Sequence, residues 1–160
     1  PTYRDNTVAS IDIDEDGCLD IPLIEPAAEE IAEKIPSVSN LTRWCTYNGK
    51  TFTVTCRTMM NYSDGYYLEI PNRWREQVVI SMDLDTRQRI VYLWDAEKSA
   101  VKSELIRIRT VSESDWDKEN NGITGFTEIS RSEGLVYAVM FGSFTGKEAI
   151  QKEELFPLLY

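Results

Sequence analysis

The acidic stretch IDIDEDGCLD at residues 11–20 is the part of the sequence whose residue types and spacing could do chemistry. Four of its aspartates fall at positions 1, 3, 5 and 9 of an EF-hand-like turn: Asp12, Asp14, Asp16 and Asp20. Gly17, at position 6, can adopt the positive φ that the reversal needs, and the backbone carbonyl of Cys18, at position 7, can face the same centre. Calcium prefers hard oxygen donors of this kind. We therefore expect a structural calcium ion held by Asp12, Asp14, Asp16, Cys18 and Asp20.

The loop departs from a true EF-hand at position 12, where Leu23 replaces a bidentate glutamate, so water must complete the coordination. We expect Glu15 to point outward, and magnesium to fit less well because it demands a strict octahedron. The alternative is an acidic, solvated turn in which aspartate serves only as a turn former. Four carboxylates converging without a cation would repel one another, which favours the calcium site.

The composition excludes several classes of function. The 160-residue chain has 27 acidic and 17 basic residues, no histidine, and a net charge of −10. Nucleic acids and anionic membranes both favour lysine and arginine, so neither is an expected partner. The absence of histidine excludes serine–histidine triads and histidine zinc sites. No apolar run approaches the roughly 18 residues of a membrane-spanning helix, and we expect no membrane insertion.

Catalysis would have to rest on aspartate and glutamate alone. The pairs Asp115 with Asp117 and Glu128 with Glu133 are candidates, but neither has a recognisable catalytic arrangement. An abundance of acids rarely marks a site by itself. We therefore expect a non-enzymatic domain and keep an acid–base hydrolase acting on glycans as an alternative.

The hydrophobic pattern predicts an α+β fold. Alternating apolar and polar residues from Leu41 onward indicate a mostly antiparallel sheet of about seven strands. Turns between strands are predicted at Asp64-Gly65, around residues 85–88 and around residues 131–134. Helices are predicted at residues 26–35, 112–119 and 145–156. Residues 6–10 and 18–24 are typical of two short strands flanking the acidic loop. We expect the sheet to pack against two or three helices, with an N-terminal hairpin that carries the calcium loop.

Pro36 and the following SVSN predict a boundary between two regions. Residues 1–36 would form the calcium-loop hairpin with its short helix, and residues 41–160 a sandwich-like α+β domain.

The cysteines of the first hairpin can be tested against geometry. Asn48-Gly49 is a strong signal for a two-residue turn, which would set Cys45 opposite Phe52. Cys45 and Cys56 would then share a face and lie roughly 13 Å apart along the ribbon. A disulfide needs Cα atoms within about 7 Å. We interpret both as buried thiols, with a bridge or a redox pair as the alternative.

Two further patterns could bind ligands. Trp44 and Trp74 could form a sugar-stacking platform, although large aromatics on short strands usually pack in a core. A basic stripe for an anionic ligand could form from four arginines: Arg87, Arg89, Arg107 and Arg109. The alternative is a solvated strand face paired with the surplus carboxylates.

The acidic loop resembles the calcium loops of the FG-GAP/VCBS family, the integrin-α-like repeats of extracellular β-propellers. Those loops follow Asp-x-Asp-x-Asp-Gly-x-x-Asp and lead into a short apolar strand, which corresponds here to residues 12–24. The match occurs once, so no propeller fits in this chain. The resemblance implies the end of a repeat region whose other blades lie upstream, and a chain that begins at Pro1 as an excised piece.

A second resemblance covers residues 66–141. The segment YYLEIPNRW, followed by strands, a helix and GLVYAVMF, is similar to uncharacterised domains of extracytoplasmic lipoproteins from Gram-positive bacteria. It is also similar to the α/β sandwich of the PsbP-type photosystem extrinsic subunit. Together the two resemblances imply an extracellular or cell-surface bacterial protein, with a lipid anchor on a segment outside this chain as one option.

These observations favour a non-catalytic, monomeric, extracytoplasmic domain that binds a protein or glycan partner and uses calcium as a structural part. The glycan-active hydrolase is one alternative. A structural spacer that carries an upstream domain away from the membrane is the other.

Overall fold

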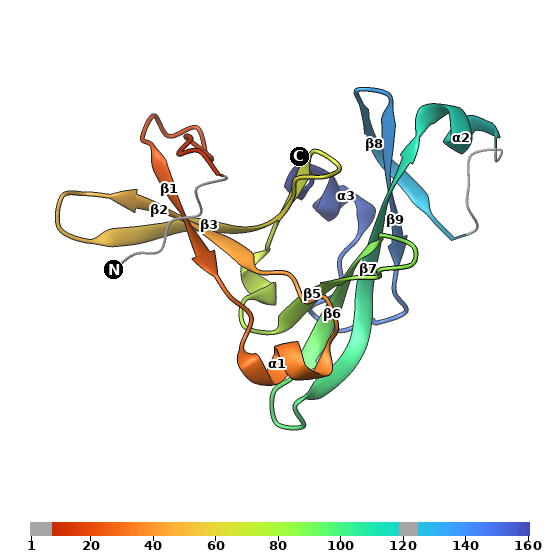
Figure 1. Cartoon of the computed structure of the whole chain (residues 1–160), viewed down its shortest axis with the longest axis horizontal. Coiled ribbons are helices and arrows are strands. Elements are labelled where there is room, and N and C mark those ends of the chain that lie inside the picture. Colours follow the sequence, from red (N-terminus) through yellow and green to blue (C-terminus); the bar gives the residue numbers. More distant parts are fainter. Residues whose placement is uncertain (1–7, 119–124) are drawn as a thin grey trace.

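The computed structural model describes residues 8–118 and 125–160, in which nine strands form two antiparallel sheets (Figure 1). Of these described residues, 46% are in strands and only about 15% in helices. The predicted α+β class is therefore wrong, because the molecule is mostly antiparallel β structure. Its described α-helices have only four to six residues, too few to form a layer of their own.

The first sheet has the strand order β1-β2-β3-β4. Its strands are β1 (Asp20–Glu25), β2 (Leu41–Tyr47), β3 (Phe52–Asn61) and β4 (Tyr66–Glu69). Each strand is antiparallel to its neighbour. The C-terminal residues complete the edge of β4, because Tyr67 and Tyr160 exchange two backbone hydrogen bonds, of 2.9 and 3.1 Å.

The second sheet has the order β5-β6-β7-β9-β8. Its strands are β5 (Val78–Met82), β6 (Arg89–Asp95), β7 (Ala100–Ser112), β8 (Thr127–Ser132) and β9 (Leu135–Phe141). The hairpins predicted around residues 85–88 and 131–134 are both present. Residues 37–39 lie along the outer edge of β5, where the Ser39 amide donates to the Ile80 carbonyl at 2.7 Å.

The helices are short and lie at the margins of the sheets. They are α1 (Glu29–Lys34), α2 (Glu113–Lys118) and α3 (Lys152–Leu155), with 3-10 turns η1 (Asn72–Trp74) and η2 (Phe156–Leu158). The helix predicted at 145–156 is reduced to α3 because the capping box forms between Gln151 and Glu154. No helix in the described ranges has the length and apolar character needed to cross a membrane.

One large hydrophobic core joins the two sheets. Met59 and Leu68 come from the first sheet, Val91 and Ile106 from the second, and Trp74 from η1; all five side chains are fully buried. Burying each aliphatic side chain of this size contributes about 1.5–3 kcal/mol. The sheets therefore pack chiefly on each other.

The predicted N-terminal hairpin is wrong. Residues 8–10 are not in a strand, and residues 6 and 7 of the predicted strand lie outside the described ranges. Ile11 and Asp20 form only an isolated bridge, while β1 pairs along its length with β2. The predicted boundary after residue 36 separates segments that touch, because Ile35 packs against Val79 and Trp94. The division into two domains stays a prediction.

The turn between β2 and β3 is longer than predicted. Tyr47 pairs with Phe52, so residues 48–51 form a four-residue loop in place of the two-residue turn. The Asn48 side-chain oxygen accepts the backbone N–H groups of Lys50 at 3.0 Å and Thr51 at 2.9 Å, which stabilises the wider loop.

A β-bulge then changes which residues of β3 face each way. Cys45 pairs with Val54 while its neighbour Trp44 pairs with Cys56, so Thr55 is the extra residue on β3. Because successive residues of β2 point to opposite faces, Cys56 shares the face of Trp44 and Cys45 lies on the other face. The predicted common face for the two cysteines is wrong.

Candidate metal site at the acidic loop

The acidic loop is closed around the carboxylate of Asp12. Its two oxygens accept the backbone N–H groups of Asp16 at 3.0 Å and Gly17 at 2.8 Å. Gly17 has a φ of 88°, as the reversal requires. Glu15, two residues earlier, is also in the left-handed region, with a φ of 60°. The sequence IDIDEDG therefore folds locally into a tight turn with its carboxylates at the surface.

Three of the predicted ligands come together. One carboxylate oxygen from each of Asp12, Asp14 and Asp20 lies within 4.8 Å of the other two. Oxygens that share one calcium ion at about 2.3–2.6 Å are at most about 5.2 Å apart. The cluster could therefore hold a metal ion.

Asp20 anchors this cluster in the first sheet. It is only 1% exposed, and its Oδ1 accepts the hydroxyls of Thr46 at 3.2 Å and Thr55 at 2.6 Å. The bulge in β3 turns Thr55 toward this face, next to Thr46, whose hydroxyl lies 3.0 Å away. The Asp20 Oδ2 accepts the backbone N–H of Ile13 at 3.3 Å, which ties the loop back to the strand.

Asp16 and Cys18 are placed differently from the three clustered aspartates. Asp16 is not a member of the cluster found in the described residues, and its Oδ1 accepts the Cys18 backbone N–H at 2.8 Å. The Cys18 thiol is exposed, and the neighbouring Asp16 charge raises its pKa. The roles of the Asp16 carboxylate and of the Cys18 carbonyl as ligands stay predictions.

A pocket of about 590 Å³ opens beside the cluster. Its walls combine the loop with β3, β4 and the C-terminal residue: Ile11, Asp12, Ile13, Asp14, Glu15, Thr55, Cys56, Tyr67, Glu69 and Tyr160. The rings of Tyr67 and Tyr160 stack with centroids 5.0 Å apart. Sequence reasoning missed Glu69 and this tyrosine pair, because only the pairing of the C-terminus with β4 brings them to the loop.

The predicted tryptophan platform is wrong. Trp44 and Trp74 are both fully buried, and each indole N–H donates to a buried partner: Thr58 at 2.9 Å and the Glu148 carbonyl at 2.6 Å. The exposed aromatic residues are tyrosines and phenylalanines. Tyr47 and Phe52 at the tip of the β2–β3 hairpin are 50% and 43% exposed, with ring centroids 4.9 Å apart.

Three of the four other carboxylates considered for catalysis are held in surface ion pairs. Asp115 accepts the Ser112 hydroxyl and pairs with Lys118, which together lower its pKa. Glu128 pairs with Arg131 at 2.8 Å, and this contact lowers its pKa as well. A general acid needs the opposite shift.

The same Arg131 also pairs with Asp117 at 3.1 Å. Glu133 lies exposed at the β8–β9 turn. None of these four carboxylates lines the pocket beside the acidic loop.

All three cysteines are free thiols. Cys45 is buried and Cys56 is half-buried, and burial raises the pKa of Cys56 to about 12. At neutral pH such a thiol is protonated and a poor nucleophile. The interpretation as buried, unbridged thiols is confirmed for Cys45, whereas Cys56 is unbridged but only half-buried. The two thiols are kept apart by their placement on opposite faces and not by a separation along the ribbon.

Comparison of the chain with family models, with curated proteins and with solved structures found no match. The resemblances to FG-GAP/VCBS loops and to PsbP-like domains accordingly stay predictions.

Proposed function

We propose that the chain is a non-catalytic calcium-binding domain of an extracytoplasmic bacterial surface protein, which presents a surface to a protein or glycan partner. The observation that supports this most is the convergence of Asp12, Asp14 and Asp20 around one point, with Asp20 buried and held by two threonine hydroxyls. A buried carboxylate needs compensation for lost hydration, and a cation supplies it directly.

The donor set favours calcium over other metals. The three clustered groups are hard carboxylate oxygens, and the described part of the chain offers no histidine or clustered thiolate for a softer ion. A site open to a pocket leaves room for the several water ligands that calcium needs to reach six to eight donors. Magnesium would demand a strict octahedron from a loop whose carboxylates extend from two separate segments.

Calcium would act here by fixing the loop to the first sheet. Asp12 and Asp14 belong to the loop, whereas Asp20 begins β1 and is hydrogen-bonded to β2 and β3. An ion shared by the two parts would hold the walls of the adjoining pocket, including the Tyr67–Tyr160 pair, in one arrangement. The tyrosines offer a protein or glycan partner rigid contact area at low entropic cost.

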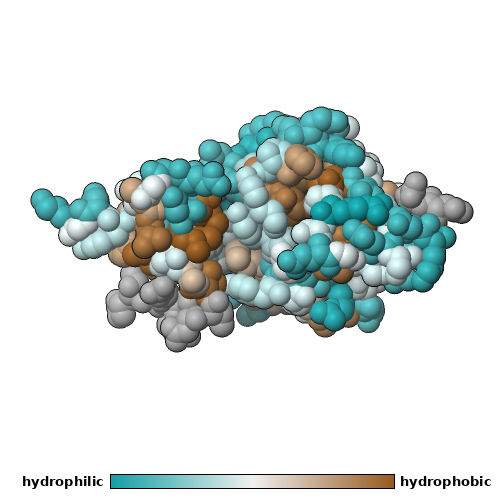
Figure 2. Space-filling view, turned by 90° about the horizontal axis from the view of Figure 1, so that it is seen from above, coloured by the Kyte–Doolittle hydropathy of each residue, from teal (hydrophilic) through white to brown (hydrophobic). Residues whose placement is uncertain are grey.

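The end of the molecule that carries this sheet also has exposed apolar surface. Figure 2 shows hydrophobic colour gathered at that end, amid largely hydrophilic surroundings. Exposed apolar residues of the first sheet and its loop are Ile11, Leu19, Tyr47 and Phe52. Exposed apolar side chains in contact, as Tyr47 and Phe52 are, can contribute to an interaction site.

Calorimetric titration with calcium tests the proposal. We expect one site per chain, and Asp14→Asn to weaken binding about tenfold or more, because it removes one charged ligand with little change of shape. Glu15→Gln is the matched control, because it removes one negative charge at the adjacent position, outside the cluster. We expect it to change the affinity for calcium less than about threefold, through long-range electrostatics alone. Equal losses in the two variants would mean that the loop attracts calcium without coordinating it.

A second candidate function rests on the pocket itself. Asp12, Asp14, Glu15 and Glu69 all line it beside the stacked tyrosines, an arrangement also compatible with acid–base hydrolysis of a glycan. This candidate predicts turnover of cell-wall or plant glycans that is lost in Glu69→Gln. A screen of such glycans without turnover would remove it.

A further inference from the structure

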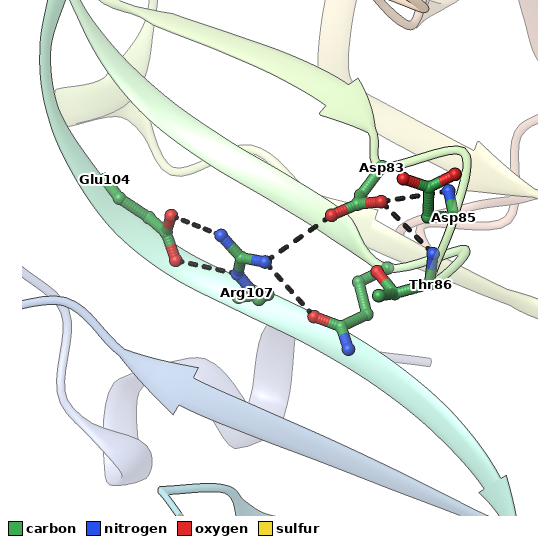
Figure 3. A network of polar contacts seen from close by, with 6 residues as sticks. Asp83, Asp85, Thr86, Glu104 and Arg107 are labelled. Atoms are coloured by element: carbon green, nitrogen blue, oxygen red, sulfur yellow. Dashed lines mark hydrogen bonds and ion pairs between the residues drawn. The ribbon is translucent and has the colours of Figure 1, made fainter.

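The four arginines of the predicted basic stripe have different environments. Arg107 is fully engaged: it forms two hydrogen bonds with Glu104, of 3.0 and 2.8 Å, and contacts Asp83 and Gln88 (Figure 3). Arg89 donates to the Ser39 hydroxyl at 3.2 Å. The predicted pairing with surplus carboxylates is therefore confirmed for Arg107, whereas Arg89 bonds to a hydroxyl.

Arg87 and Arg109 have no such partner. Neither guanidinium makes a hydrogen bond or an ion pair with any residue in the ranges 8–118 and 125–160. In a chain with 27 carboxylate side chains and 17 basic ones, pairing would be easy to achieve. Other basic side chains of the described residues, such as Arg75, also have no ion pair, but Arg87 and Arg109 differ from them because both line the same pocket.

The two arginines line a common pocket of about 230 Å³, together with Asp64, Thr86 and Thr110. The pocket lies beyond the end of β6, whose first residue, Arg89, pairs with Ile108 of β7. From Arg109 onward β7 has no β6 neighbour, and the turns β5–β6 and β3–β4 approach it instead. The Tyr137 hydroxyl holds the second turn in place by donating to the Asp64 carbonyl at 3.1 Å.

The conformation of Arg87 supports a role for its side chain. Its φ is 58°, in the left-handed region that favours glycine or asparagine. The turn is rigid, because the Asp83 carboxylate accepts the backbone N–H groups of Asp85 at 3.0 Å and Thr86 at 3.1 Å (Figure 3). This rigid turn holds the Arg87 side chain at the wall of the pocket.

The remaining walls fit the same interpretation. Thr110 has a buried hydroxyl without a hydrogen-bond partner, a feature that calls for an explanation in a native structure. Asp64 is the one carboxylate in the wall, and it already accepts the Asn61 side-chain amide at 2.9 Å. Two guanidinium groups outnumber it, so the pocket is locally positive in an acidic protein.

We propose that this pocket is a binding site for a doubly charged tetrahedral oxyanion, a sulfate or phosphate group. Two separate guanidinium groups match its two charges and its several acceptor oxygens. The pocket lies in the second sheet and at the tip of the β3–β4 turn, away from the acidic loop, so this site does not depend on calcium.

Backbone amide NMR titration tests the site in calcium-free buffer. Sodium sulfate, sodium phosphate and sodium acetate are added in separate arms, with sodium chloride used to hold ionic strength constant, because screening alone moves exposed signals. We expect saturable shifts at residues 86–87 and 109–110 with sulfate or phosphate, and weaker binding of acetate. The anion with the lower midpoint concentration is the one that the site binds more tightly. Shifts that do not saturate, or that spread evenly over the surface, would overturn the proposal.

Variants then assign the binding to the two arginines. Arg109→Gln should raise the sulfate midpoint about tenfold or more, since it removes a charged hydrogen bond. Arg87→Gly should do the same while keeping or raising the melting temperature, because glycine relieves the strained φ. The Arg87→Gly variant therefore tests the proposed site even if Arg109→Gln folds poorly.

Two controls complete the test. Asp64→Asn should lower the sulfate midpoint, because it removes the repulsion between the Asp64 carboxylate and the anion. Arg75→Gln, which removes an exposed arginine outside this pocket, should leave the midpoint unchanged. A midpoint that moves equally in Arg75→Gln and Arg87→Gly would contradict the site.

Discussion

At the scale of single residues, Asp20 is the position on which the candidate metal site depends. It is the only clustered carboxylate that is buried, and its oxygens already serve three donors from three segments of the described chain. The spacing of the aspartates predicted that Asp12, Asp14 and Asp20 would converge. It could not predict Thr46 and Thr55 as partners, because they lie 26 and 35 residues away and meet Asp20 only through strand pairing.

Thr55→Val tests how much the hydrogen bond to Asp20 contributes to stability. The valine keeps the shape of the side chain but removes the hydroxyl that donates to Asp20 at 2.6 Å. We expect a loss of about 1–3 kcal/mol in the free energy of unfolding, as for a buried hydrogen bond to a charged group. Urea unfolding monitored by tryptophan fluorescence measures it.

Thr53→Val is the matched control on the same strand. Thr53 is exposed and lies opposite Thr46, so its replacement should change the free energy of unfolding by less than about 0.5 kcal/mol. Equal effects at the two positions would show that the Asp20 contact contributes no more than an ordinary surface threonine.

At the scale of elements, turn residues and alternation predicted the hairpins well. The turns at Asp64-Gly65, at residues 85–88 and at residues 131–134 all lie where the sequence indicates. The Asn48-Gly49 turn failed because the Asn48 side chain closes a wider loop. The bulge at Thr55 was also missed, since no residue type in β3 marks it, and it reverses the face of Cys56.

The β5–β6 turn supplies a pH-dependent prediction. The Thr86 and Asp85 backbone N–H groups, with Arg107 nearby, lower the pKa of Asp83 below its ordinary value of 3.8. A lowered pKa in the folded state means stability that is present at neutral pH and is lost as pH falls through that lowered value. Asp83→Asn should therefore be less stable than the wild type at neutral pH, and the difference should shrink at pH values below 3.8.

Urea midpoints across this pH range measure the effect. Asp85→Asn is the control from the same turn, because only its backbone N–H takes part in the network. A difference for Asp83→Asn that stays constant with pH would contradict an ionic role for this carboxylate.

At the scale of the whole molecule, the sequence predicted antiparallel pairing but not the class of fold. Residues 26–35 and 145–156 have helical spacing, yet their helices stop after six and four residues. The two sheets bury their apolar residues against each other, through Leu68 on one side and Ile106 on the other, and leave the helices to the margins. Short amphipathic stretches cannot reveal which layer will cover a sheet, because that choice is made by long-range packing.

The measurement that most directly tests the central claim is the melting temperature of the chain in excess calcium and in excess chelator. Calcium at about one hundred times its dissociation constant should add about 2.7 kcal/mol of stability. For a chain of this size that corresponds to a rise of about 5–10 °C, because each kcal/mol shifts the midpoint by about 2–4 °C. Asp14→Asn should lose most of this rise. Identical melting temperatures of the wild-type chain in calcium and in chelator would contradict the account and leave the loop as an acidic turn.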